Sequence, residues 1–201
     1  NWLPSVTRER LGEKEIDMHT LVSLALRQRP ECIIVGEIRG KEALALFQAM
    51  STGHTAYSTM HADNIQGAVN RLRGEPINLP SQMFEALDVI CLQLLTHIGR
   101  KRVRKNLSIF EFLSVDPDAN KIRVVNTFTW DAQANDFKEV SESQLLKGLM
   151  TERGWTPIQL VREIKNREAL LEYLVDNNIE DNKQIAALIS LYYYDQERAM
   201  A

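Results

Sequence analysis

The fold is decided by the stretch from Arg29 to Asp63, which reads RPECIIVGEIRGKEALALFQAMSTGHTAYSTMHAD. Residues 32–35 form a short, unbroken apolar run behind Pro30, which is typical of a strand buried on both faces of a parallel sheet. Residues 41–49 favour a helix, and residues 55–60 favour a second short strand. This order of strand, helix and strand predicts an α/β fold.

Both expected strands end in residues that can carry chemistry. Gly36 and Glu37 follow the first strand, and His61 follows the second. In open α/β sheets, ligands bind outside the carboxyl ends of the strands. We therefore expect Glu37 and His61 to meet at one edge of one sheet.

Composition restricts the kinds of protein this chain can be. It has 201 residues, of which 44% are hydrophobic and 25% charged, as in an ordinary soluble globular protein. The net charge is −3, so the chain as a whole lacks the excess of positive charge that is typical of nucleic-acid-binding proteins. No apolar run is long enough to span a bilayer, and no signal-peptide pattern is present. Cys32 and Cys91 lie singly in apolar runs, which predicts core thiols in a reducing compartment.

The remaining segments predict a change of architecture at residue 141. Before it, we expect a sheet that begins in α/β style and finishes with antiparallel strands. The expected elements are helices over 17–29, 64–73 and 81–87, buried strand 88–95, strand 103–113, a turn at 116–120 and antiparallel edge strand 121–128. After it, three helix-start signatures follow: Ser141 with Gln144, Thr156 with Gln159, and Asp181 with Gln184. The expected domains are an α/β core over 1–140 and a helical appendage over 141–201.

Glu37 and the histidines have competing interpretations. A carboxylate after an apolar strand fits a Walker-B-like element that orients an attacking water or holds Mg²⁺, but a strand-end glutamate paired with Arg39 is the simpler alternative. His54 and His61 can sense a γ-phosphate, or they can be ordinary satisfied polar residues. A metal site of His54, His61 and Asp63 is a third option. The strand between the two histidines separates them, so we expect no metal site of this kind.

The chain lacks a loop that could cradle phosphates. No G-x-x-x-x-G-K-[ST] motif occurs in it; in GEIRGK (residues 36–41) the glycines are one residue too close, and Glu42 takes the Ser/Thr place. Because positioning is most of phosphoryl-transfer catalysis, we expect these 201 residues alone to bind ATP weakly or not at all. The chain begins at Asn1 without a methionine, so we expect it to be part of something longer.

The densest basic run consists of Arg100, Lys101, Arg102, Arg104 and Lys105. Its usual meaning is a solvated hairpin tip. The alternatives are a contact with a neighbouring subunit, a phosphate or an anionic lipid surface.

Several segments of the first half together resemble one family. They are NWLP (1–4) with VTR (6–8), LRQRPE (26–31), IVGEIRG (34–40), FQAMSTGH (47–54), STMHAD (58–63), RL (71–72) and PINLP (76–80). On these segments the chain resembles the secretion-superfamily ATPases, the motor proteins of type II and type IV secretion and of pilus assembly. It resembles their archaeal branch most, which includes the archaellum motor ATPase. Bacterial members often carry a four-cysteine zinc element, which this chain lacks.

The resemblance implies a fold and a working unit. The fold would be the C-terminal part of a RecA-like P-loop ATPase domain, with a mixed sheet that has antiparallel end strands, followed by the small helical appendage. The P-loop and the acidic Asp box would precede Asn1. The working unit would be a cytoplasmic homo-hexamer at the inner face of the cytoplasmic membrane. It would dock on a polytopic membrane platform protein and use ATP with Mg²⁺, without nucleic acid.

The resemblance also implies roles for individual residues. Glu37 would be the Walker B glutamate, and His54 and His61 would be the His-box histidines, all three catalytic. We further expect the nucleotide to be contacted by Arg8, Gly36, Arg39 and Thr59. The alternative from a different class is a non-catalytic assembly and docking module that does not bind ATP by itself.

Overall fold

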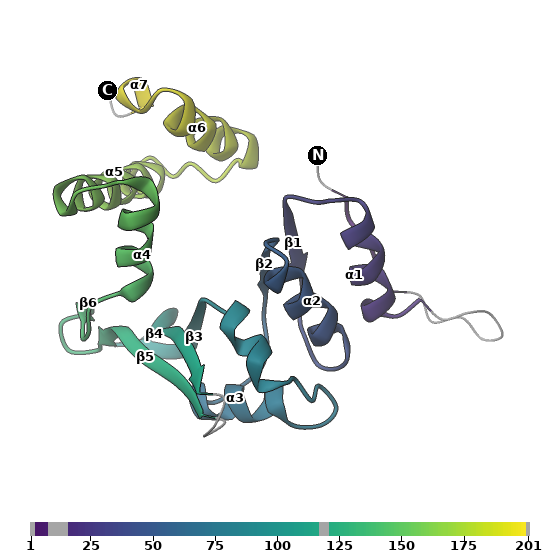
Figure 1. The fold of residues 1–201 in the computed structure, drawn as a ribbon. Coiled ribbons are helices and arrows are strands. Elements are labelled where there is room, and N and C mark those ends of the chain that lie inside the picture. Colours follow the sequence, from purple (N-terminus) through teal and green to yellow (C-terminus); the bar gives the residue numbers. More distant parts are fainter. Residues whose placement is uncertain (1–2, 8–15, 117–120, 200–201) are drawn as a thin grey trace. The chain divides into compact units, whose positions relative to one another are not determined.

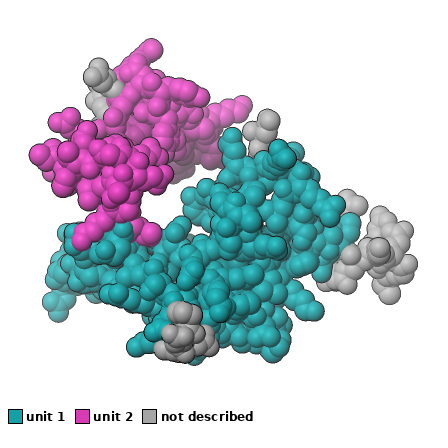
Figure 2. All heavy atoms as spheres, viewed as in Figure 1, with its two compact units in different colours: residues 1–144 teal, residues 145–201 magenta. Residues whose placement is uncertain are grey.

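The computed structural model describes residues 3–7, 16–116 and 121–199 (Figure 1). The chain divides into two compact units, residues 1–144 and residues 145–201 (Figure 2). Each unit buries apolar residues of its own. The change to helices that the sequence predicts after Ser141 lies close to this division.

The first unit combines helices and strands, which confirms the α/β class. Its described elements are α1 (Met18–Arg27), β1 (Cys32–Val35), α2 (Glu42–Ser51), β2 (Thr55–Ser58), α3 (Ile65–Arg73), the 3₁₀-helix η1 (Ser81–Ala86), β3 (Val89–Ile98), β4 (Lys101–Asp116), β5 (Lys121–Asp131) and β6 (Asp136–Glu139). Asp17 caps α1, as predicted, by accepting the backbone N–H of Thr20. The helix predicted from Ser81 is a 3₁₀-helix without a side-chain cap.

β1 and β2 form a parallel pair joined by α2, as the sequence predicts. The register aligns Cys32 with Thr55 and Val35 with Ser58, and α1 packs against α2 (Figure 1). The prediction that β1 is buried on both faces is wrong. Ile33 and Val35 join the core, whereas the alternate side chains face outward and Ile34 is 55% exposed. Cys32 lies on this outward face, so it is not a core thiol.

β3, β4, β5 and β6 form a separate antiparallel sheet, with the strands in that order (Figure 1). The described residues therefore contain two sheets where the sequence predicted one. β5 lies between β4 and β6, so its prediction as an edge strand is wrong. β3 is an edge strand with an exposed Cys91 rather than the buried strand predicted. Most of the turn predicted at 116–120 lies outside the described residues.

One core connects the two sheets of the first unit. Phe47 of α2, Phe84 of η1 and Phe112 of β4 form an aromatic chain, in which the Phe84 ring centroid lies 6.2 Å from each of the other two. Phe47 and Phe84 are almost fully buried. Large buried aromatic rings dominate packing energetics, so these three rings hold the antiparallel sheet against the helix between the parallel strands.

The remaining elements are helices: α4 (Gln144–Arg153), α5 (Pro157–Asp176), α6 (Asn182–Tyr194) and α7 (Gln196–Ala199). Thr156 and Gln159 form the predicted capping box at the start of α5, and Asp181 caps α6. Ser141 is not the cap of α4. At the start of α4, the buried carboxylate of Glu111 accepts the Gln144 backbone N–H at 2.9 Å.

Candidate functional site

The carboxyl ends of β1 and β2 lie side by side because the two strands are parallel and in register. Backbone pairing continues beyond the strands, where the Ile38 N–H donates to the Thr59 carbonyl at 2.9 Å. The Thr59 hydroxyl donates to the Gly36 carbonyl at 2.6 Å. These bonds fix residues 36–38 against the segment that leads to His61, as expected from the sequence.

Glu37 is the centre of a small charged cluster at this edge. The His61 Nε2 atom lies 3.4 Å from Glu37 Oε1, and the Arg39 guanidinium makes an ion pair with Glu37 Oε2. The side chains of His61 and Arg39 are 82% and 70% exposed, whereas that of Glu37 is 22% exposed. The structure thus brings Glu37, Arg39 and His61 together, with the carboxylate innermost.

Arg39 stabilises the ionised form of Glu37. The hydrogen bond from the Arg39 guanidinium lowers the pKa of the Glu37 carboxyl below its usual value, against the opposing effect of desolvation. The positive charges of Arg39, His61 and Arg71 act in the same direction as that hydrogen bond. Glu37 is therefore an ionised carboxylate at neutral pH.

One oxygen of this carboxylate lies near His61 but makes no hydrogen bond. Glu37 Oε1 is buried and accepts no hydrogen bond from any described residue. Apart from its two chain neighbours, nothing described lies within 4 Å of where a Cβ at Gly36 would be, so the backbone at Gly36 is open. Mg²⁺ prefers oxygen ligands and is commonly bound through one or two carboxylates together with substrate phosphates. Glu37 and the neighbouring Thr59 hydroxyl oxygen fit this donor chemistry.

Arg71 belongs to the same edge, although sequence reasoning assigned it no role. It lies on α3, and its guanidinium donates to the His61 carbonyl at 3.0 Å. Asn64 caps α3 by accepting the Gly67 backbone N–H, so the helix starts at Ile65, four residues after His61. Periodicity places Arg71 on a helix but does not show which loop its long side chain reaches.

His54 is not part of this cluster, because it lies at the opposite end of β2 from His61, as the sequence predicts. It precedes β2, whereas His61 follows it, and the four strand residues between them span roughly 13 Å. The His54 Nδ1 atom lies 3.2 Å from both the Ala49 carbonyl and the Thr52 hydroxyl. His54 therefore satisfies polar groups at the end of α2, as in the simpler interpretation of its position.

The other expected site residues divide into three cases. Arg8 lies outside the described residues. Gly36 and Thr59 are joined by their hydrogen bond beside Glu37. Arg39 pairs with Glu37, as the simpler alternative for this glutamate predicted. Across residues 3–7, 16–116 and 121–199, no three His, Cys, Asp or Glu side chains gather as a metal site would require.

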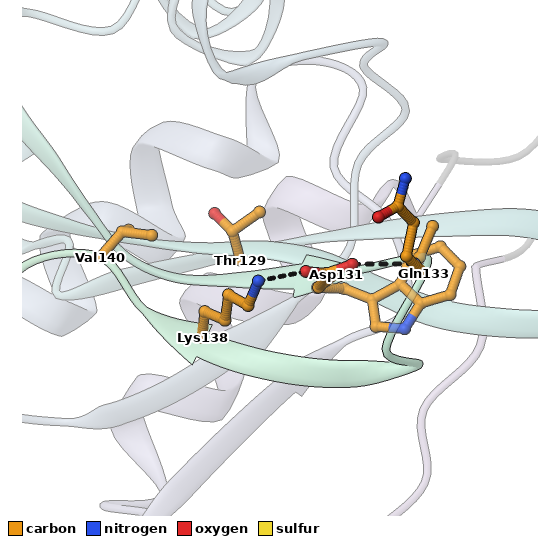
Figure 3. A pocket seen from close by; sticks show the side chains of 7 residues that line it. Thr129, Asp131, Gln133, Lys138 and Val140 are labelled. Atoms are coloured by element: carbon orange, nitrogen blue, oxygen red, sulfur yellow. Dashed lines mark hydrogen bonds and ion pairs between the residues drawn. The ribbon is translucent and has the colours of Figure 1, made fainter.

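A pocket elsewhere in the first unit lies on the β5–β6 hairpin and is lined in part by Thr129, Trp130 and Val140 (Figure 3). Its charged groups are already paired, because Lys138 makes an ion pair with Asp131. Asp131 Oδ1 also accepts the Gln133 backbone N–H at 2.8 Å. These contacts stabilise the turn of the hairpin, and the pocket carries no further chemistry.

Comparison with known proteins identifies the family. Residues 6–155 match the model of the family described as "Type II/IV secretion system protein". The chain belongs to this family. Residues 134–201 also match a second family, described as "PilB3-like, C-terminal", which covers the helical unit. The expected resemblance and the RecA-like α/β fold class are thereby confirmed.

The relatives of this type II/IV secretion system protein include archaeal and bacterial chains. It is 39% identical over 176 residues to an uncharacterized protein of Methanocaldococcus jannaschii, covering 87% of this chain and 65% of the relative. It is 29% identical over 179 residues to a twitching motility protein of Neisseria gonorrhoeae, covering 80% and 46%. It is 31% identical over 121 residues to the type II secretion system protein E of Pseudomonas aeruginosa, covering 55% and 24%.

The chain therefore spans between about a quarter and two thirds of the length of these relatives. Among its described helices, none combines the length and the apolar character that crossing a bilayer would need.

Proposed function

We propose that the protein is an ATPase motor that hydrolyses ATP to drive type II secretion or the assembly of a type IV pilus-like filament, including an archaellum. The observation that carries this proposal is the meeting of Glu37 and His61 at the carboxyl ends of two parallel strands, where Glu37 Oε1 makes no hydrogen bond. Membership of the type II/IV secretion family supports it. Relatives named for twitching motility and type II secretion point to the same class of process.

Glu37 acts in this proposal as an orienting carboxylate rather than as a strong base. A general base works best with a pKa near the operating pH, whereas Arg39 lowers the pKa of Glu37. The Oε1 atom would accept a hydrogen bond from the attacking water or would bind Mg²⁺. Mg²⁺, when bound, would supply charge stabilisation for the phosphates.

His61 and Arg39 serve as the polar contacts for the terminal phosphate. Both side chains are exposed beside Glu37, so both can reach a phosphate placed at this edge. Imidazole and guanidinium N–H groups are suitable donors to phosphate oxygens. Arg71 donates a hydrogen bond to the His61 carbonyl and so fixes the backbone position from which the imidazole side chain extends. We assign His54 a structural role at the end of α2 and place Arg8, Gly36 and Thr59 around the nucleotide.

The proposed working unit is a homo-hexamer in the cytoplasm, bound peripherally to the membrane through a polytopic platform protein. Membership of the secretion family supports these partners. Nucleic acid has no place in the proposal, in keeping with the net charge of −3.

A second candidate function is a non-catalytic assembly and docking module. It is favoured by one observation: no G-x-x-x-x-G-K-[ST] motif occurs anywhere in the 201 residues. In this case the chain would provide subunit and platform contacts without hydrolysing ATP.

The test is the Glu37→Gln substitution in the full-length protein. We expect the rate of ATP hydrolysis to fall by about 100-fold or more, which is the lower end of the range found when a positioned catalytic group is lost. The Kd for ATP should change little. Glu31→Gln is the matched control, since Glu31 is an exposed carboxylate directly before β1. Hydrolysis by Glu37→Gln at the parent rate would remove Glu37 from the mechanism. A full-length parent that does not bind ATP would favour the docking module.

A further inference from the structure

The end of the β3–β4 hairpin concentrates positive charge in a chain that is negative overall. Residues 89–110 contain five of the 24 Lys and Arg residues and none of the 27 Asp and Glu residues. We call residues 94–105 the basic hairpin. They comprise the end of β3, the two-residue turn Gly99–Arg100 and the start of β4. Gly99 adopts φ of +58°, a conformation that favours glycine in such a turn.

The strand register distributes these cations over both faces. Leu95 pairs with Arg104 and His97 with Arg102, which places these four side chains on one face. Leu95, Arg102 and Arg104 line a shallow pocket on that face. On the opposite face, Leu94 pairs with Lys105 and Ile98 with Lys101. Arg100 occupies the turn itself.

The basic hairpin also exposes apolar side chains between its cations. Leu94, Leu95 and Ile98 are 38%, 45% and 37% exposed. From β4, only the portion from Ser108 onward pairs with β5, so this end of the hairpin extends beyond the paired sheet. The result is a projecting two-stranded ribbon on which apolar and cationic side chains alternate.

Among the described residues, none of the cations of the basic hairpin makes an ion pair with a carboxylate. The Lys105 Nζ atom lies 5.9 Å from the centre of the Trp130 ring. The acidic group on the next residue of β5, Asp131, pairs with Lys138 instead. The positive charge of this surface is therefore available to an external anion.

We propose that the basic hairpin docks on the surface of an anionic lipid bilayer. Anionic headgroups attract Lys and Arg side chains near a membrane surface, and adjacent apolar side chains enter the headgroup region. The cations here lie on both faces and at the tip, without converging on one point. That arrangement suits a laterally extended layer of charge better than a single bound phosphate or a protein carboxylate. This inference does not depend on ATP hydrolysis.

The test is co-sedimentation of the full-length protein, without nucleotide, with vesicles of phosphatidylcholine alone or with phosphatidylglycerol added. We expect binding to the anionic vesicles only, weakening as salt is raised. Each cation near an anionic surface contributes on the order of fivefold in affinity, so Arg102→Gln/Arg104→Gln should weaken binding roughly 25-fold. Arg162→Gln/Lys165→Gln is the matched control, because it removes two exposed cations from α5 and should leave binding unchanged.

A charge-conserving variant distinguishes a lipid surface from other anionic partners. Arg102→Lys/Arg104→Lys should bind the vesicles nearly as well as the parent, since a headgroup layer responds to charge and not to the guanidinium fork. Equal binding of the parent to neutral vesicles would overturn the proposal. So would unchanged binding of the Gln variant. Tight binding of the parent to an oligonucleotide or an acidic peptide, without binding to anionic vesicles, would assign the surface to that other partner instead.

Discussion

At the scale of single residues, the account rests on the electrostatic contacts of Glu37 with Arg39 and His61. Arg39 lowers the pKa of Glu37 and pairs with Oε2, while His61 Nε2 lies 3.4 Å from Oε1. The ion pair with Arg39 is thus compatible with the proposed catalytic role, because Oε1 still makes no hydrogen bond.

The pH dependence of activity tests this relation. Arg39 lowers the pKa of Glu37, so Arg39→Gln raises it. If the ionised carboxylate is required, the acidic limb of the kcat/KM profile for ATP hydrolysis should move to higher pH in Arg39→Gln. Arg27→Gln, which removes an exposed cation at the end of α1, is the control and should leave that limb in place. An unmoved acidic limb in Arg39→Gln would mean that Glu37 is not the group that titrates.

At the scale of elements, the β5–β6 hairpin shows how one carboxylate fixes a turn. Asp131 accepts the backbone N–H groups of Gln133 and Ala134 and pairs with Lys138. Chiefly through the bond from Lys138, the pKa of Asp131 falls from 3.8 to about 2. Because the folded pKa is lowered, the carboxylate's contribution to stability is complete above about pH 4 and is lost as the pH falls through about 2.

Lys138→Met tests this hairpin. Removing the ammonium should raise the pKa of Asp131 toward its ordinary value, but not fully to it, because two backbone N–H donors remain. The loss of stability between pH 4 and 2 should become correspondingly smaller. Carboxyl NMR titration measures the pKa directly. An Asp131 pKa still at about 2 in Lys138→Met would show that the backbone N–H donors alone account for the shift.

The sequence predicts these elements unevenly, for physical reasons. β1, α2 and β2 are predictable because an apolar run and a helix-forming segment are local signals. The parallel arrangement then places Glu37 and His61 at one edge by a general rule of α/β sheets. β6, with the sequence DFKE and four exposed residues, carries no such signal. Its pairing with β5 is a tertiary contact that periodicity does not specify.

The contacts of the candidate site also depend on tertiary structure that local sequence signals do not specify. Family resemblance groups His54 with His61, yet the two lie at opposite ends of β2. The sequence assigns Arg71 no role, because its contact with the His61 carbonyl depends on where α3 lies. Burial on one face of β1 rather than two depends on what covers the sheet, and no residue of β1 itself encodes that.

At the scale of the whole molecule, two units serve distinct parts of the proposed motor. The unit of residues 1–144 contains the Glu37 edge and the basic hairpin, and Phe47, Phe84 and Phe112 pack its two sheets on one core. The unit of residues 145–201 is helical and matches a C-terminal family of its own. Within this chain, the residues to which we assign chemistry all lie in the first unit.

The most direct test is a structure of the full-length protein with Mg²⁺ and a non-hydrolysable ATP analogue. The account predicts that the γ-phosphate lies beside both strand ends, with the His61 imidazole within hydrogen-bond reach of it, about 3 Å, and the Glu37 carboxylate at the Mg²⁺ or one water away. A γ-phosphate bound elsewhere, with Glu37 still paired to Arg39 and touching neither Mg²⁺ nor the reacting water, would contradict it.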